Sequence, residues 1–77
     1  MIDPKEFLEL EARTMGRPCT LVGAEEIAGV MFIVYDTVIP CDDRFQHTRR
    51  WAVMSEDEQG RKGRAGGIVK IEMRDKA

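Results

Sequence analysis

A short segment combines a thiol, two carboxylates and an imidazole, which are the groups that nucleophilic catalysis uses. It contains Cys41, Asp42 and Asp43, followed after three residues by His47, the single histidine of the chain. A Cys–His pair acts through the thiolate, and neighbouring carboxylates raise the pKa of a thiol and disfavour that form. The segment also lacks the paired ligand spacing of a zinc site. We interpret it as a polar turn, and we expect no enzymatic activity, no metal and no other cofactor.

A phosphate-binding loop is the second possibility, because the sequence GRKGRAGG at residues 60–67 combines three cations with four glycines. It matches neither GxxxxGKS/T nor GxGxxG, and we expect a strand rather than a helix after it, so a nucleotide site is excluded. The connection over 56–66 has 11 residues, which is long for a hairpin. Its glycines and balanced charges predict a mobile loop that orders when it binds a partner.

Aromatic and basic side chains interleave over residues 44–51. Exposed rings stack on bases while cations neutralise phosphates, so this pattern favours nucleic acid as one partner. The acidic run at 56–58 and the net charge of −2 disfavour it. Another protein, or copies of the chain itself, is the leading hypothesis, since methionines adapt to partner surfaces and an edge strand pairs with another chain. The candidate contact residues are Arg44, Phe45, His47, Arg49, Arg50, Trp51, Arg61, Lys62 and Arg64.

Charge is distributed unevenly along the chain. Residues 1–43 carry three cations and nine acidic residues, which gives −6, whereas residues 44–77 carry nine cations and five acidic residues, which gives +4. Such asymmetry favours head-to-tail association or a polyanionic partner. The alternative is that the two halves interleave in space and neutralise each other.

The N-terminal element is expected to be an amphipathic helix over about residues 4–15. Asp3 is a suitable N-cap, Pro4 suits the first helical position, and Gly16 is a natural stop. Glu11 falls inside the apolar arc, where we expect it to reach the edge of the packed face or to pair with a cation. The apolar arc comprises Phe7, Leu8, Leu10, Ala12 and Met15.

Residues rich in β-branched and aromatic side chains predict the strands. The strand candidates lie at about 19–22, 30–39, 50–55 and 67–74. The segment 30–39 is nearly all apolar, which is typical of a central strand buried on both faces. The segment 67–74 alternates, and this alternation predicts that Val69, Ile71 and Met73 face the core.

These elements predict a single domain over 1–77, an α+β fold in which the helix packs on a small three- to four-stranded, mainly antiparallel sheet. Residues 24–29 are compatible with helix or strand, and the β-branched residues that follow favour a strand. The apolar run over 27–35 is too short to cross a bilayer, and the N-terminus lacks the pattern of a signal peptide, so we expect a cytoplasmic protein with no membrane partner. Two cysteines are too few for a disulfide-dependent scaffold.

The order of the expected elements resembles that of small phage virion-joining proteins. The resemblance consists of a helix, a Gly-x-Pro turn at 16–18, a sheet and a terminal strand with the sequence GIVKIE. It is a likeness of element order without a shared motif, and it assigns no role to any residue. The function expected from the residues is therefore a small protein-binding or assembly module that contacts its partner through 56–66 and 44–51, with nucleic-acid binding as the alternative.

Overall fold

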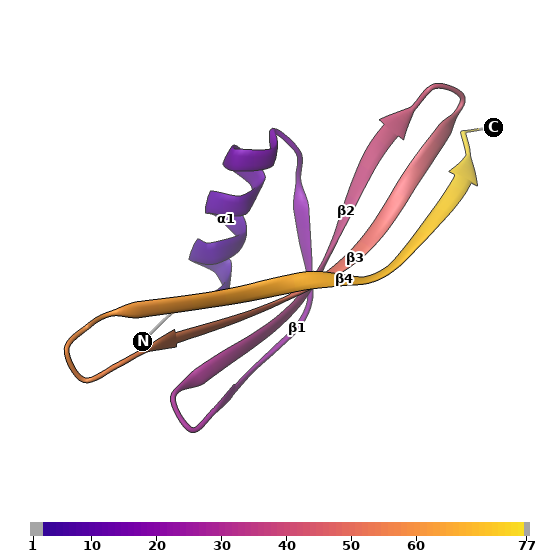
Figure 1. Ribbon diagram of the computed structural model, residues 1–77. Coiled ribbons are helices and arrows are strands. Elements are labelled where there is room, and N and C mark those ends of the chain that lie inside the picture. The colour runs from indigo at the N-terminus through magenta and orange to yellow at the C-terminus, as the bar shows by residue number, and fades with distance from the viewer. Residues whose placement is uncertain (1–2, 77) are drawn as a thin grey trace.

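A computed structural model describes residues 3–76 as one helix followed by four strands (Figure 1). The elements are α1 (Pro4–Met15), β1 (Cys19–Ile27), β2 (Val30–Cys41), β3 (Arg44–Glu56) and β4 (Lys62–Asp75). Each strand pairs antiparallel with the next along the chain, so the sheet has the order β1-β2-β3-β4. The α+β class, with a helix on an antiparallel sheet, is confirmed. Among the described residues, α1 is the single helix, and it is too short and too polar to cross a membrane.

The helix is held at both ends by local contacts. The carboxylate of Asp3 accepts a hydrogen bond of 2.9 Å from the backbone N–H of Lys5, and Gly16 adopts a left-handed conformation with φ 65°. Gly16 tolerates this conformation because it has no Cβ. Only Phe7 and Leu8 of α1 are buried, whereas Leu10, which we expected on the packed arc, is 59% exposed. The helix therefore contacts the sheet through a narrow arc.

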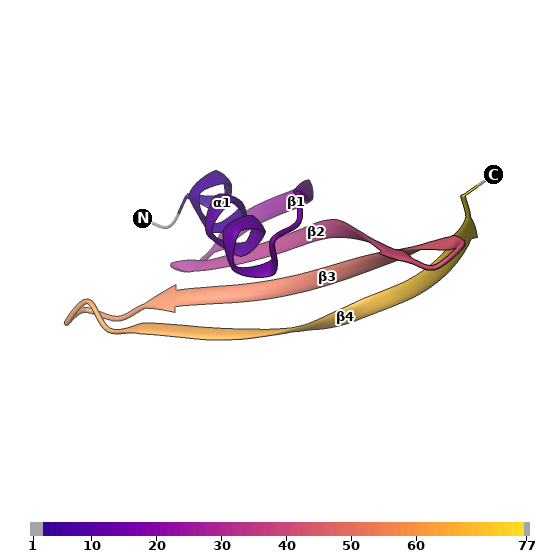
Figure 2. The same ribbon diagram turned by 90° about the horizontal axis from the view of Figure 1, so that it is seen from above.

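The sheet is longer than the helix that lies on it (Figures 1 and 2). The molecule measures 50 × 21 × 16 Å, and β2, β3 and β4 continue well beyond α1. The core lies between the helix and the part of the sheet beneath it. It consists of Phe7, Leu8, Met31, Ile33, Tyr35, Ala52 and Met54.

The connection between β3 and β4 is shorter than the mobile loop that we expected over 56–66. β3 continues to Glu56 and β4 begins at Lys62, which leaves 57–61 as the turn. The Asp57 carboxylate accepts hydrogen bonds from the backbone N–H groups of Gln59 at 3.0 Å and Arg61 at 2.8 Å. These bonds organise the turn internally, as is typical of an aspartate at a turn position.

The glycines near the end of the chain lie in a strand rather than in a loop. A Cβ atom on Gly66 would lie 3.1 Å from the carbonyl oxygen of Trp51, and one on Gly67 would lie 2.8 Å from the Trp51 Nε1. Glycine at these positions allows β4 to approach β3 closely beside the indole ring. The glycine run therefore reflects close packing, which sequence composition does not distinguish from flexibility.

Apolar and charged residues alternate along β4, but the apolar ones are not buried. Val69, Ile71 and Met73, which we expected to face the core, are 54%, 53% and 44% exposed. β4 is an edge strand, and it extends beyond the part of the sheet that α1 covers (Figure 2). A register shift opposite Arg49 and Arg50 adds a bulge to the strand. Within residues 3–76, therefore, no layer covers the apolar side of β4.

The N-terminal half of the sheet consists of longer strands than the sequence indicates. β1 includes residues 24–27, so this segment is a strand, and a tight turn follows at Ala28 and Gly29, both with positive φ. Positive φ at both turn residues is typical of a hairpin that matches the twist of its strands. β1 and β4 are the two edges of the sheet, and β2 and β3 are its centre.

Candidate interaction surface

One face of the sheet lies opposite α1, and we call it the open face. Met31, Ile33 and Tyr35 of β2 point toward α1, and successive side chains of a strand point to opposite faces. The even-numbered residues of β2 and their partners in β3 therefore lie on the open face. Among residues 3–76 the single helix, α1, packs on the other face, so no helix covers this side of the sheet.

An apolar cluster occupies the open face over the two central strands. Phe32 is paired with Val53 and Val34 with Trp51 across the β2–β3 ladder. Phe32 is 43% exposed and Trp51 is 38% exposed, although both belong to central strands. We call these four residues the open-face cluster. Large apolar side chains in the middle of a sheet normally pack against a second layer, and here the second layer covers only the other face.

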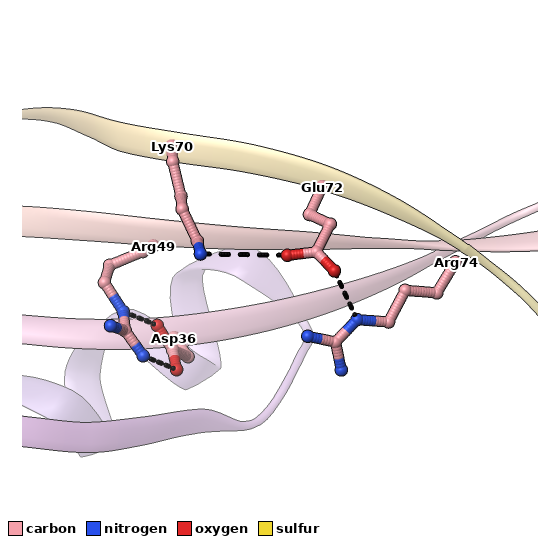
Figure 3. A network of polar contacts seen from close by, with 5 residues as sticks. All are labelled: Asp36, Arg49, Lys70, Glu72 and Arg74. Carbon is pink, nitrogen blue, oxygen red and sulfur yellow. Dashed lines mark hydrogen bonds and ion pairs between the residues drawn. The ribbon is translucent and has the colours of Figure 1, made fainter.

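A row of charged side chains lies beside the open-face cluster (Figure 3). We call it the charged row, and it consists of Asp36, Arg49, Lys70, Glu72 and Arg74. Arg49 donates two hydrogen bonds to the Asp36 carboxylate, at 2.8 and 2.9 Å, and so bridges β3 and β2. On β4, Glu72 accepts from Arg74 Nε at 3.0 Å and lies 3.7 Å from the Lys70 ammonium. Hydrogen bonding to Arg49 lowers the pKa of Asp36, and hydrogen bonding to Arg74 lowers the pKa of Glu72. Both carboxylates are therefore ionised at neutral pH, and the row carries both signs of charge.

Four of the predicted contact residues meet on the open face. Phe45, His47, Arg49 and Trp51 alternate along β3 and share this side of the sheet. The Lys76 ammonium lies 5.1 Å from the centre of the Phe45 ring. The odd-numbered residues of 45–51 thus form a continuous strip of aromatic and polar side chains along one face of β3.

Two predicted cations are held by contacts elsewhere in the fold. Arg61 lies in the β3–β4 turn, where its Nε contacts the Asp57 carboxylate at 2.6 Å. Arg64 lies on the helix side of β4, donates to Glu11 at 2.6 Å, and places its guanidinium 4.9 Å from the centre of the Phe7 ring. The glycine-rich segment therefore does not present these two cations as one patch with the open face.

The remaining predicted residues lie at the ends of the strands or on the helix side. Arg44 begins β3 and lies 3.3 Å from the Asp75 carboxylate, and Lys62 begins β4 opposite Glu56. Arg50 faces the helix side, where its Nε is buried and has no hydrogen-bond partner among residues 3–76. The nine predicted residues are thus divided between two faces and a turn.

A polar cluster under the helix was not predicted as a group. Glu11 accepts a hydrogen bond of 3.1 Å from the Tyr35 hydroxyl in addition to its contact with Arg64. Burial and the nearby Glu11 raise the pKa of Tyr35 to about 12, and burial raises the pKa of the Cys19 thiol. Both groups are neutral at physiological pH, so neither is an activated nucleophile. One indication of this cluster was present in the sequence, because Glu11 is an acidic residue inside the otherwise apolar arc of the helix.

The segment that combined cysteine, aspartates and histidine is a hairpin end rather than a converged site. Cys41 Sγ lies 3.9 Å from the Gln46 side-chain oxygen, Asp42 has φ 54° in the turn, and His47 lies on the open face. Among residues 3–76 no three side chains of the metal-binding types are grouped to hold an ion. Comparisons with protein-family models, with curated proteins and with solved structures find no match to this chain, so its surface chemistry carries the functional argument.

Proposed function

We propose that this chain is a small non-enzymatic assembly module that binds another protein or copies of itself through the open face. The observation that supports the proposal is the open-face cluster, which stays in contact with solvent although it lies directly behind the part of the sheet that α1 buries. Contiguous exposed apolar groups with a polar border are typical of interaction sites on soluble proteins. The border in this case is the charged row.

The composition of the open face matches that of a protein interface. Tryptophan and arginine dominate binding hot spots, and Trp51 and Arg49 are neighbours on the same face of β3. The charged row supplies the polar rim, which orients a partner and speeds its association. Segment 44–51 contributes the strip from Phe45 to Trp51, and segment 56–66 contributes Ala65, which lies opposite Val53.

Site-specific photo-crosslinking in the cell that naturally produces the chain tests this proposal. A photoreactive phenylalanine analogue replaces Phe32 in the open-face cluster, and the same analogue replaces Leu10 in a control variant. Leu10 is a matched control because it is also exposed and apolar but lies on α1, on the other side of the sheet. We expect a discrete adduct from position 32 and none from position 10, and mass spectrometry of the adduct identifies the partner protein or a second copy.

Two results would contradict the assignment of the open face. Equal adduct yields from positions 32 and 10 would mean that crosslinking reports general surface exposure. Absence of an adduct at position 32, with the variant folded and expressed, would mean that no protein covers this face.

Nucleic-acid binding is the second candidate, because aromatic and basic side chains alternate along the open-face strip of β3. Stacking on rings and contacts with phosphates would bind a single strand. Arg49 is already neutralised by Asp36, which weakens the attraction for phosphates. Titration with mixed-sequence single-stranded DNA at low and high salt, followed by Trp51 fluorescence, separates the candidates. Binding that weakens steeply with salt would favour nucleic acid, and we expect none.

A further inference from the structure

β4 exposes an unusual edge to solvent. It is the last strand of the sheet and runs for 14 residues, so in the described part of the chain one side of its backbone has no strand beside it. Its exposed apolar residues are Ile68, Val69, Ile71 and Met73. A long edge strand with apolar side chains is a template for pairing with another strand.

The charges of β4 are self-complementary in one register. A closed dimer formed by two antiparallel copies of an edge strand has a twofold axis through a residue that faces its own copy. If the axis passes at Ile71, Lys70 of each copy lies opposite Glu72 of the other, and Met73 lies beside Val69, the extra residue of the β4 bulge. Two pairs of opposite charge then flank an apolar centre, and such cross-strand pairs stabilise a sheet.

The neighbouring registers are electrostatically worse. An axis at Lys70 or at Glu72 places that residue opposite its own copy, which brings like charges together. An axis at Met73 pairs Glu72 with Arg74 but places Ile71 opposite Asp75. Only the axis at Ile71 matches charge with opposite charge and apolar with apolar through the centre of the strand.

We propose that two copies of this chain pair through their β4 edges, antiparallel and centred on Ile71, to form one continuous eight-stranded sheet. This inference rests on the proposed assembly function and names a second copy as a partner. The pairing provides hydrogen bonds for the free backbone groups of β4. It also brings Ile71 and Met73 into cross-strand contact with Ile71 and Val69 of the other copy, although the face of the sheet stays uncovered. Lys70 and Glu72 exchange their contact within the strand, at 3.7 Å, for contacts between the copies.

Edge protection by charge is the simpler explanation of Lys70, Glu72 and Arg74, since charged residues and bulges discourage strand pairing. That explanation accounts for the face that carries these charges, but it does not account for Ile71 and Met73 on the other face, which remain in water. The edge strand β1 is also a weaker candidate for pairing, because it has 9 residues against the 14 of β4. Each of the two edge strands contains one register shift.

A charge-exchange experiment tests the register. Lys70→Glu places two acidic residues on the edge, Glu72→Lys places two basic residues there, and each variant repels its own copy. Both side chains are exposed, so both variants are expected to fold. We expect the wild type to sediment as a monomer–dimer equilibrium and each single variant to dimerise at least about tenfold more weakly. An equimolar mixture of the two variants recovers a dimer, because acidic and basic edges then meet.

The outcomes of this experiment are separable from those of the crosslinking experiment. The β4 pairing is overturned if the wild type remains monomeric up to millimolar concentration, if it closes into a larger ring, or if the single variants dimerise as well as the wild type. A monomer that still crosslinks to a protein at position 32 would leave the open-face proposal intact. Recovery of the dimer by mixing, with no adduct at position 32, would overturn the open-face proposal alone.

Discussion

The part of the sheet beneath α1 and the part that extends beyond it are built from the same strands but are stabilised differently. Under the helix, Ile33, Tyr35 and Ala52 are almost completely removed from solvent. Beyond the helix, Ile71 and Met73 lie on the corresponding face and are exposed. Burial of apolar surface is the main stabilising contribution in a small domain, so the first part carries most of the folding free energy.

The boundary between the two parts contains buried polar groups. Thr37 and Thr48 face each other across β2 and β3 and are as buried as the core. Thr48 Oγ1 accepts a hydrogen bond of 3.1 Å from the Gln46 amide, whereas Thr37 Oγ1 has no partner among residues 3–76. The extended part is therefore held by the strand ladders and charge pairs, and its apolar side chains are available for contacts outside the chain.

The strongest test of this difference replaces one isoleucine in each part by alanine, so that the same three side-chain carbons are removed from both. Ile33→Ala deletes a side chain that is 1% exposed and should lower the free energy of unfolding by about 2–5 kcal/mol. Ile71→Ala, at 53% exposure, should change it by less than about 1 kcal/mol. Urea unfolding at a protein concentration low enough to keep the chain monomeric measures both values. Equal losses would mean that the extended part is stabilised by burial as well.

Alkaline pH should destabilise the covered part selectively. The pKa of Tyr35 is raised to about 12 in the folded chain from an ordinary value of 10.0, so the neutral hydroxyl is favoured by folding. This contribution is complete below pH 10 and is lost as pH rises from 10 to 12, with a total on the order of 2 kcal/mol.

Tyr35 is the single tyrosine, so ultraviolet absorbance of tyrosinate reports its ionisation directly. A native-state midpoint near 10 would show that the hydroxyl is not held in a buried site. Glu11→Gln is the matched variant, because it removes the negative charge beside the hydroxyl and should lower the midpoint.

The packing of Trp51 against β4 provides a smaller test at the border of the two parts. Gly67→Ala places a methyl group 2.8 Å from the present position of Trp51 Nε1, so the indole must move. We expect destabilisation of about 1 kcal/mol and a red shift of the emission of this single tryptophan, because the ring can swing toward solvent. Gly23→Ala is the control, since a Cβ there meets no atom within 4 Å. An unchanged emission spectrum in Gly67→Ala would argue against the close approach of β4.

The smallest effect is expected for the charge pair on the extended part. Asp36→Asn removes the negative charge and one of the two oxygens that accept from Arg49, and it should cost less than about 1 kcal/mol at neutral pH, because both side chains are partly solvated. The pKa of Asp36 is lowered from 3.8 by Arg49, so its contribution is present above pH 3.8 and is lost as pH falls through the lower folded value. Thermal unfolding of both proteins across the acid range measures this. A difference that persists at strongly acidic pH would assign the effect to something other than the ion pair.

The helix and the strands were predictable in kind because their signals are local. Asp3 and Gly16 cap the helix through atoms within five residues of the helix ends, and β-branched residues favour extended backbone wherever they occur. The lengths of the strands were not predictable, because each residue of a ladder depends on a partner that lies far along the chain. The glycine run at 60–67 was misinterpreted for this reason, since its role depends on the position of Trp51.

The candidate surface could be predicted in part. The alternation along β3 placed Phe45, His47, Arg49 and Trp51 on one face, but the sequence alone grouped them with Arg50 and Arg64, which the sheet places on the other side. The role of Arg64 could not be inferred, because its partner Glu11 is 53 residues away.

Capping, turn propensity and alternation act within a few bonds, so they were enough to predict the helix, the central part of each strand and the two-sided chemistry of the strands. They did not predict that 44–49 and 62–66 are also strand. Only the tertiary structure decided which of those sides is covered. A single short helix buries one part of one face and leaves the open face and the β4 edge in solvent. Coverage depends on the relative length and position of layers, which are properties of the assembled chain.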